Sequence, residues 1–321
     1  MDFFYYFFKY AFLFLFFFSF GTYVLHHLFV AFWFKTQNLK KRYNAQWALV
    51  TGSSSGIGKA LAFKLARQGL NVVLVALGDK LLDDTFEEFK AAFPKQQFRK
   101  VPANLGKDGY LPEISRATED VDVQIVFCNA GYLLTGFFHN RTLEELMLNL
   151  NCNAISGVQI THLFVGRMVA KKLPGCVVFT SSAAAVMPSP FSVQYAATKS
   201  FISAFGASLA PEIKPHGIDV LVFHPSPVAS RFYDKAHKID MLDFFKQFAV
   251  APEDLPDTVF ASIGRTIWRD IGPTAISFRC LMKILDYNFL SFMASLFSKY
   301  LPDFKRQQAA EAAAEKGSKK A

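Results

Sequence analysis

The sequence predicts an α/β protein built on a doubly wound parallel sheet, with a transmembrane segment at its N-terminus. Short apolar strands alternate with helical spacing from residue 46 onward, which indicates strands joined by helices. A glycine-rich turn follows the first of these strands, and a long apolar run precedes it. The 321 residues are 52% apolar and 19% charged, which excludes a disordered chain.

The first 34 residues form a separate region, because they hold 13 of the 37 Phe residues. The run from Tyr10 to Phe34 is long enough to cross a bilayer once with tilt. It ends in aromatic residues, which argues against a cleaved signal peptide, and the basic residues after it predict that the following domain faces the cytosol. A shallow hairpin turning near Gly21, with both ends cytosolic, is an alternative that the sequence leaves open. His26 and His27 are expected to be neutral side chains near a wet interface.

The charge of +9 is concentrated outside the predicted sheet. Residues 35–42 carry +4 and residues 305–321 carry +3, so that only +2 remains for residues 43–304. A nucleic-acid groove would need more positive charge within the folded domain, whereas flanking charge suits a membrane surface. The cysteines form no C-x-x-C pair and no cluster with zinc spacing, which predicts free thiols, a reducing compartment and no metal site. They are Cys128, Cys152, Cys176 and Cys280.

A strand, a glycine turn, a helix and a second strand follow one another between residues 46 and 76. The strands are expected at 46–51 and 71–76, and the helix at 59–67. Glycines allow the backbone to approach a pyrophosphate, and a helix N-terminus supplies amides and positive potential. The turn therefore predicts dinucleotide binding by Gly52, Ser54, Ser55, Gly56, Ile57 and Gly58.

Three further motifs follow predicted strands or helices in the order that one enzyme family shows. The strand at 123–128 ends in Asn129-Ala130-Gly131, and the strand at 176–180 leads into Ser181-Ser182. Tyr195-x-x-x-Lys199 begins 13 residues after Ser182. Together with the glycine turn, these motifs resemble the short-chain dehydrogenase/reductase family over residues 46–280. The resemblance implies a Rossmann-type sheet, an NAD(P) cofactor, and cofactor contacts from Asn129, Ala130 and Gly131.

Carbonyl reduction needs a hydride at carbon and a proton at oxygen, and the resemblance assigns the proton to Tyr195. A phenol has a pKa near 10, and a neighbouring cation lowers it. Lys199 lies one helical turn away and is also expected to hold the nicotinamide ribose. Ser182 is expected to bind the substrate oxygen. Asn153, chosen over Asn149 and Asn151 by its distance from Met168, is expected to hold a water linked to Lys199.

The cofactor's two ends have separate expected partners. After the predicted strand at 219–223, the run from His224 to Ser230 resembles the family's turn over the nicotinamide, with Ser226 and Ser230 in place of Gly and Thr. This implies cofactor contacts from Pro225, Ser226, Val228 and Ser230. At the adenosine end, Lys80 is a candidate for the 2′-phosphate and Asn104 replaces an Asp near the adenine. NADPH is therefore favoured over NADH.

The layout narrows the resemblance to the microsomal group of 3-oxoacyl-CoA reductases and 17β-hydroxysteroid dehydrogenases type 12. This implies an endoplasmic-reticulum enzyme that reduces long-chain 3-oxoacyl-CoA to 3-hydroxyacyl-CoA in fatty-acid elongation. Partners would be the membrane, elongation-complex enzymes and a possible second copy in a homodimer. A 17β-hydroxysteroid dehydrogenase or a 3-ketosphinganine reductase would use the same four residues. A non-catalytic lipid-membrane binding protein on the same fold is the alternative of another class.

These expectations divide the chain into five parts. They are a membrane anchor (1–34), a basic linker (35–45), the reductase domain (46–280), amphipathic helices (281–304) and a charged tail (305–321). The tail is expected to be a frayed helix or disordered. Within the reductase domain, residues 231–250 correspond to the family's mobile lid over the substrate. Their apolar side chains suit an acyl or sterol body as well as ordinary helix packing.

Overall fold

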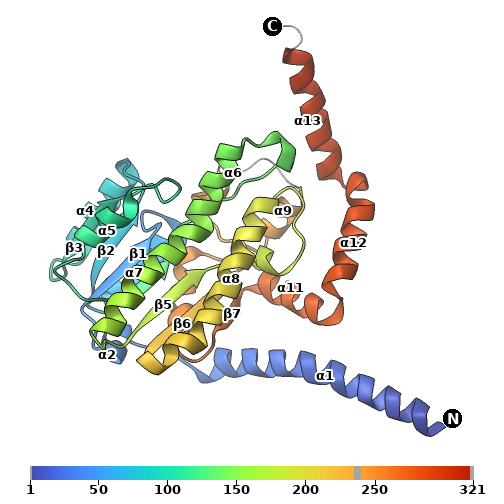
Figure 1. The fold of residues 1–321 in the computed structure, drawn as a ribbon, viewed down its shortest axis with the longest axis horizontal. Helices are drawn as coiled ribbons and strands as arrows, with labels where there is room; N and C mark the ends of the chain where they lie inside the picture. The colour runs from blue at the N-terminus through green and yellow to red at the C-terminus, as the bar shows by residue number, and fades with distance from the viewer. Residues whose placement is uncertain (1, 235–239, 319–321) are drawn as a thin grey trace.

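The sheet at the centre of the molecule has seven parallel strands in the order β3-β2-β1-β4-β5-β6-β7 (Figure 1). The computed structural model describes residues 2–234 and 240–318. The strands are β1 (Trp47–Thr51), β2 (Asn71–Ala76), β3 (Phe98–Pro102), β4 (Val123–Cys128), β5 (Gly175–Thr180), β6 (Ile218–Pro225) and β7 (Trp268–Ile271). The predicted doubly wound sheet is confirmed.

Helices lie on both faces of this sheet and around it. They are α1 (Asp2–Trp33), α2 (Leu39–Tyr43), α3 (Gly56–Arg67), α4 (Lys80–Ala92), α5 (Tyr110–Arg116), α6 (Leu143–Leu150), α7 (Ser156–Ala170), α8 (Val193–Ile213), α9 (Asp240–Lys246), α10 (Leu255–Ser262), α11 (Pro273–Ile284), α12 (Tyr287–Phe297) and α13 (Pro302–Ser318). One core cluster joins the sheet to α3, α4 and α10, and the other joins it to α5, α7 and α8. Within β1, Ala48 and Val50 face the first cluster and Leu49 faces the second, as strand alternation requires.

The order of the strands reverses between β1 and β4, which are neighbours although two strands separate them in the chain. The connections that follow these two strands lead to neighbours on opposite sides, so their carboxyl ends form the topological switch point of the sheet. In open α/β sheets this is where ligands bind. The residues after β1, β4 and β5 are the ones that the sequence singled out.

Helix α1 is one continuous helix that passes through Gly21 without a turn. The N-terminal segment therefore does not turn back near Gly21 as a hairpin would. By length and composition α1 could cross a membrane, and Val30 is its single buried residue. In Figure 1 the helix runs below the sheet and its N-terminal end projects beyond the domain.

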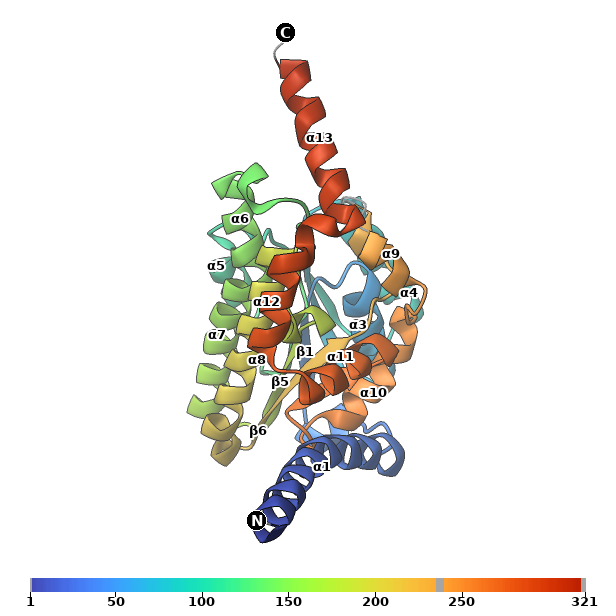
Figure 2. The ribbon, with the colours of Figure 1, turned by 90° about the vertical axis from the view of Figure 1, so that its right-hand side faces the viewer.

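The C-terminal segment forms three helices on the outside of the domain. Helices α11 and α12 meet at a sharp bend of 105°. Seen from the side, α11 and α12 lie in front of the sheet and α13 extends away from it (Figure 2). Helix α13 continues to Ser318, through most of the tail for which we expected either a frayed helix or disorder, and residues 319–321 lie outside the described residues.

Candidate active site

The turn after β1 is shaped to receive a phosphate group. Gly52 and Gly56 have positive φ angles of 64° and 52°, which favour glycine. A Cβ at Gly58 would overlap the carbonyl of Gly52, so that a larger residue there would displace the turn. Ser55 precedes α3 and makes no side-chain cap, which leaves its hydroxyl and the first amides of the helix for a ligand. The turn therefore fits a dinucleotide.

Residues after β4 hold this turn in place. The hydroxyl of Thr51 accepts hydrogen bonds from the backbone amides of Asn129 and Ala130, both at 2.9 Å. The Asn129 side chain donates to the Thr51 carbonyl at 3.1 Å and accepts from the Thr180 hydroxyl at 2.9 Å. One asparagine thus ties together the ends of β1, β4 and β5. This explains structurally why the motif follows the strand directly.

Tyr195 and Lys199 lie on α8, one turn apart and both buried. The Lys199 ammonium donates to the Thr180 carbonyl at 2.8 Å and lies 5.7 Å from the centre of the Tyr195 ring. Burial lowers the pKa of Lys199 to about 8. Burial also raises the pKa of Tyr195, while a hydrogen bond with Ser182 lowers it. Desolvation therefore outweighs the Ser182 hydrogen bond, and the lowering of the Tyr195 pKa by Lys199 that the sequence led us to expect is not found.

Asn153 and Gly131 complete this cluster. A Cβ at Gly131 would lie 3.1 Å from the Asn153 amide oxygen and 3.3 Å from the Lys199 ammonium, so these three residues converge. Asn153 sits in a π-helical turn at Asn151–Ile155, a feature that often marks functional sites. Its amide accepts from the Tyr132 amide and donates to the Tyr132 carbonyl, each at 2.9 Å.

A small cavity lies beside Asn153. Its volume is about 10 Å³, which is roughly the room that one water molecule needs. Its lining includes the polar side chains of Thr51, Asn153, Ser156 and Thr180. That Asn153 holds a water molecule stays a prediction. This cavity is the place where such a water would fit.

Ser182 follows β5 and is half-buried. Its hydroxyl accepts from the backbone amide of Ala184 at 3.2 Å and is also hydrogen-bonded to Tyr195. The hydroxyl groups of Ser182 and Tyr195 therefore lie side by side. This is the arrangement that a carbonyl oxygen requires.

The turn expected over the nicotinamide divides into two parts. Ser230 is close to the glycine turn, since a Cβ at Gly56 would lie 3.2 Å from the Ser230 side chain. Ser226 is buried, and its hydroxyl accepts from the Ala275 amide at 3.1 Å, so its side chain caps α11. Val228 packs in the core, and Pro225 ends β6. Ser230 is therefore the member of this group whose side chain borders the phosphate turn.

The two residues expected near the adenosine are both exposed. Lys80 begins α4, with its ammonium 2.6 Å from the Asp84 carboxylate. Asn104 follows β3 and accepts from the Gly106 amide at 3.0 Å. Asp79, the acid nearest the tip of β2, caps α4 by accepting from the Leu82 amide at 3.1 Å. This carboxylate is therefore already engaged.

Two contacts around Tyr195 and α8 escaped the sequence analysis. The first is Phe232, whose ring lies 5.8 Å from that of Tyr195 and covers it. Tyr233 follows, and burial raises its pKa to about 12. Phe232 lies in the segment predicted to be a lid, but sequence periodicity could not select it from the other aromatic residues there.

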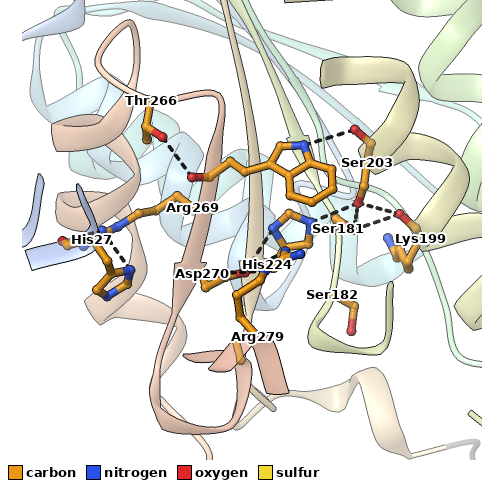
Figure 3. Close-up of polar contacts among 12 residues, drawn as sticks. His27, Ser181, Ser182, Lys199, Ser203, His224, Thr266, Arg269, Asp270 and Arg279 are labelled. Atoms are coloured by element: carbon orange, nitrogen blue, oxygen red, sulfur yellow. Dashed lines mark hydrogen bonds and ion pairs between the residues drawn. The ribbon is translucent and has the colours of Figure 1, made fainter. Parts of the chain in front are cut away.

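The second is a buried polar cluster beneath Lys199, which we call the support cluster (Figure 3). The Ser203 hydroxyl donates to the Lys199 carbonyl at 2.7 Å and lies 3.0 Å from His224 Nε2. His224 Nδ1 is 3.4 Å from Asp270, which Arg279 contacts at 3.1 Å. Burial lowers the pKa of His224 to about 4, so the ring is neutral at pH 7. The one sequence feature that could have indicated this cluster is His224, a histidine near the end of a buried strand.

The fold and these groups define a class. A phosphate-binding turn, a buried Tyr–Lys pair and a neighbouring serine at the carboxyl ends of a parallel sheet are what a dehydrogenase needs. The short chain dehydrogenase family model matches residues 46–239. The chain belongs to this family of NAD(P)-dependent oxidoreductases.

Several known proteins are similar to this chain over most of its length. A very-long-chain 3-oxoacyl-CoA reductase-like protein of Arabidopsis thaliana is 32% identical over 72% of this chain and 76% of its own length. The 17-beta-hydroxysteroid dehydrogenase type 3 of Mus musculus is 31% identical over 64% of this chain and 67% of its own. A short-chain dehydrogenase from Sphingobium yanoikuyae in complex with NADPH superposes with a TM-score of 0.64, at 25% identity over 70% of this chain and 87% of its own. A 7beta-hydroxysteroid dehydrogenase structure shares the fold, with a TM-score of 0.70 and 22% identity over 80% of this chain and 100% of its own.

Proposed function

We propose that this chain is a membrane-anchored reductase that converts long-chain 3-oxoacyl-CoA to 3-hydroxyacyl-CoA with NADPH. The observation that carries the proposal is the convergence of Ser182, Tyr195 and Lys199 beside the phosphate turn. The relative in Arabidopsis thaliana supports the substrate class through its name. The proposed place is the endoplasmic-reticulum membrane with the reductase domain in the cytosol, beside other enzymes of fatty-acid elongation. The proposed assembly is a homodimer.

The dinucleotide supplies the hydride when it is bound. The chain's own groups then have three tasks. Tyr195 donates its phenolic proton to the carbonyl oxygen, while Ser182 donates a hydrogen bond to the same oxygen. Lys199 stabilises the phenolate that remains, and its low pKa allows it to pass a proton onward near neutral pH. Phe232 covers Tyr195 and must move aside when substrate enters.

NADPH is the proposed cofactor. The carboxylate of Asp79 is engaged in capping α4, so it is poorly placed to select the ribose hydroxyl of NADH. Lys80 is exposed next to it and can turn from Asp84 towards a 2′-phosphate. The NADPH complex of the structural relative from Sphingobium yanoikuyae is consistent with this choice.

The second candidate is a keto-steroid reductase. The mouse relative named 17-beta-hydroxysteroid dehydrogenase type 3 favours it, and the Tyr–Lys–Ser group would serve both substrates equally. An aromatic lid suits an acyl chain and a sterol alike. A 3-ketosphinganine reductase and a non-catalytic membrane protein rank below these two candidates. Neither the Arabidopsis thaliana relative nor the mouse relative carries such a name.

The test is a comparison of substrates on the full chain in detergent or nanodiscs. NADPH consumption is followed with a long-chain 3-oxoacyl-CoA, a 17-keto steroid and 3-ketosphinganine, with NADH in parallel. We expect the highest kcat/KM with the 3-oxoacyl-CoA. A preference for the steroid would replace the first candidate with the second, and no turnover with any of the three would favour the binding protein.

A further inference from the structure

The contacts of α1 divide this helix into two parts. Residues 2–22, the anchor part, expose most of their large aromatic side chains. Residues 23–33, the docked part, bind the reductase domain through polar groups. The Tyr23 hydroxyl donates to Asp270 at 3.0 Å, His26 lies 3.1 Å from the Thr266 hydroxyl, and Arg269 donates to the His27 carbonyl at 3.1 Å.

These contacts attach the docked part firmly to β7, the edge strand of the sheet. Asp270 and Arg269 are each 5% exposed, so the helix covers two charges that would be costly to leave without partners. Figure 3 shows His27 and Arg269 meeting at this junction. The docked part therefore belongs to the reductase domain. At 1.5 Å per residue the anchor part spans about 30 Å, the thickness of a bilayer's hydrocarbon core.

Helix α12 is a second apolar surface. It contains no charged residue and no buried one. Phe289, Phe292 and Leu296 recur at helical spacing on its outer face and are 49%, 57% and 48% exposed. Leu290 and Met293 alternate with them and are half-buried. The outer face is thus apolar, aromatic and uncovered, as in helices that lie in a membrane interface.

The two surfaces lie on the same side of the molecule. In Figure 1 the anchor part projects beyond the domain on the side where α12 lies, and α12 runs across the direction of α1. Figure 2 views the molecule from that side and shows α12 in front of the sheet. A bilayer crossed by the anchor part would therefore lie alongside α12, with α12 close to the membrane plane.

The charges around α12 suit a lipid surface. Lys283 and Lys299 lie just before and just after the helix, and both are exposed. The neighbouring acid Asp286 caps the helix by accepting from the Phe289 amide at 3.0 Å. An apolar face between two lysines matches acyl chains flanked by anionic head groups. A second protein copy would have to bury the same lysines.

We propose that α12 lies in the cytosolic interface of the bilayer that the anchor part crosses, with Phe289, Phe292 and Leu296 in lipid. This inference rests on the membrane anchoring in the proposed function. Two attachments then fix the orientation of the domain on the membrane. They also bring the lid region to the bilayer, because Phe245 of α9 packs on Phe278 of α11 at 5.0 Å.

The experiment attaches a fluorescent probe to one introduced cysteine at a time in the full chain in phosphatidylcholine–phosphatidylserine nanodiscs. The native Cys128, Cys152 and Cys176 stay in place, and the chain without an introduced cysteine measures their labelling. The probe sits at Phe292→Cys, with Cys280→Ser in the background. Phe14→Cys reports the anchor part, and Lys95→Cys reports the turn between α4 and β3, on the far side of the domain in Figure 1. Quenching by doxyl lipids measures contact with the bilayer, and quenching by iodide measures contact with water. NADPH binding checks that each variant is folded, and Phe289→Cys repeats the measurement on the same face.

We expect doxyl lipids to quench the probes at positions 292 and 14 several-fold more than the probe at 95, and iodide to show the opposite order. If the probe at 14 is in lipid but that at 292 is quenched only by iodide, α12 is in water and the inference is wrong. Shielding of 292 from both quenchers would mean that protein covers this face, which also overturns it. A probe at 14 outside lipid would refute the anchoring itself.

Discussion

Two buried polar clusters meet at α8, and they differ in what their groups are free to do. In the catalytic cluster, the hydroxyl groups of Ser182 and Tyr195 are bonded to each other and can turn to a ligand, and the Lys199 ammonium donates to the Thr180 carbonyl. In the support cluster, Asp270 accepts from Tyr23 and from Arg279, and Ser203 is bonded to Lys199 and His224. One cluster is arranged to donate protons and the other to hold a helix in place. Substitutions in the catalytic cluster should therefore lower turnover, and substitutions in the support cluster should lower stability.

The largest effect is expected from Tyr195→Phe. This change removes the proton donor and leaves the ring in the core, so turnover should fall by about 10²–10⁴-fold. The free energy of unfolding should change little. Steady-state NADPH consumption and thermal unfolding are measured on the same preparation. Equal losses of activity and stability would mean that Tyr195 is structural.

Asp270→Ala should have the opposite signature. It removes the partner of Arg279 and Tyr23 in a buried site, and breaking a buried pair costs about 3–5 kcal/mol. We expect a large loss of stability in chemical denaturation and a smaller change in kcat for the protein that remains folded. Asp257→Ala, at an exposed ion pair with Lys64, is the matched control and should have little effect. If Asp270→Ala lowered kcat as much as Tyr195→Phe does, the distinction between a catalytic cluster and a support cluster would be wrong.

The pH dependence of stability tests His224. Its pKa is lowered to about 4 in the folded protein, so the unfolded chain binds more protons between about pH 6.5 and 4. Stability should therefore fall as the pH falls through this window, by at most about 1.4 kcal/mol per pH unit. His224→Gln, which keeps a hydrogen-bonding group beside Ser203, should lose this part of the slope. Identical slopes in both proteins would show that His224 does not titrate with unfolding.

The smallest effect is expected at the exposed end of the cofactor site. Lys80→Ala removes a candidate partner for the 2′-phosphate, so KM for NADPH should rise a few-fold while KM for NADH stays unchanged. Asp84→Ala is the control, because it frees Lys80 from its ion pair and should not raise KM for NADPH. If Lys80→Ala changed KM equally for NADPH and NADH, Lys80 would not bind the 2′-phosphate.

Local sequence patterns predicted the sheet well. The strands β1, β2 and β4 and the turn between β1 and α3 lie where expected, because buried apolar runs flanked by glycine leave few alternatives. The spacing of Tyr195 and Lys199 placed both on one helical face, and the structure brings Ser182 to them. Such features depend on neighbours within a few residues.

Features that depend on distant contacts could not be predicted. Tyr23 meets Asp270 across 247 positions of the chain, and no local pattern identifies that pair. His26 and His27 were expected to lie near a wet interface, and they contact Thr266 and Arg269. The strand β7 is only four residues long, and the Ser226 hydroxyl turns to α11 because that helix packs against it.

The measurement that tests the central claim most directly is NADPH consumption with a long-chain 3-oxoacyl-CoA by the wild-type chain and by Tyr195→Phe. NADPH affinity is determined for both proteins by fluorescence titration. The account predicts turnover by the wild type, a loss of about 10²–10⁴-fold in the variant, and similar NADPH affinities. Turnover that survives in Tyr195→Phe would contradict the assignment of the proton donor, and with it the proposed active site.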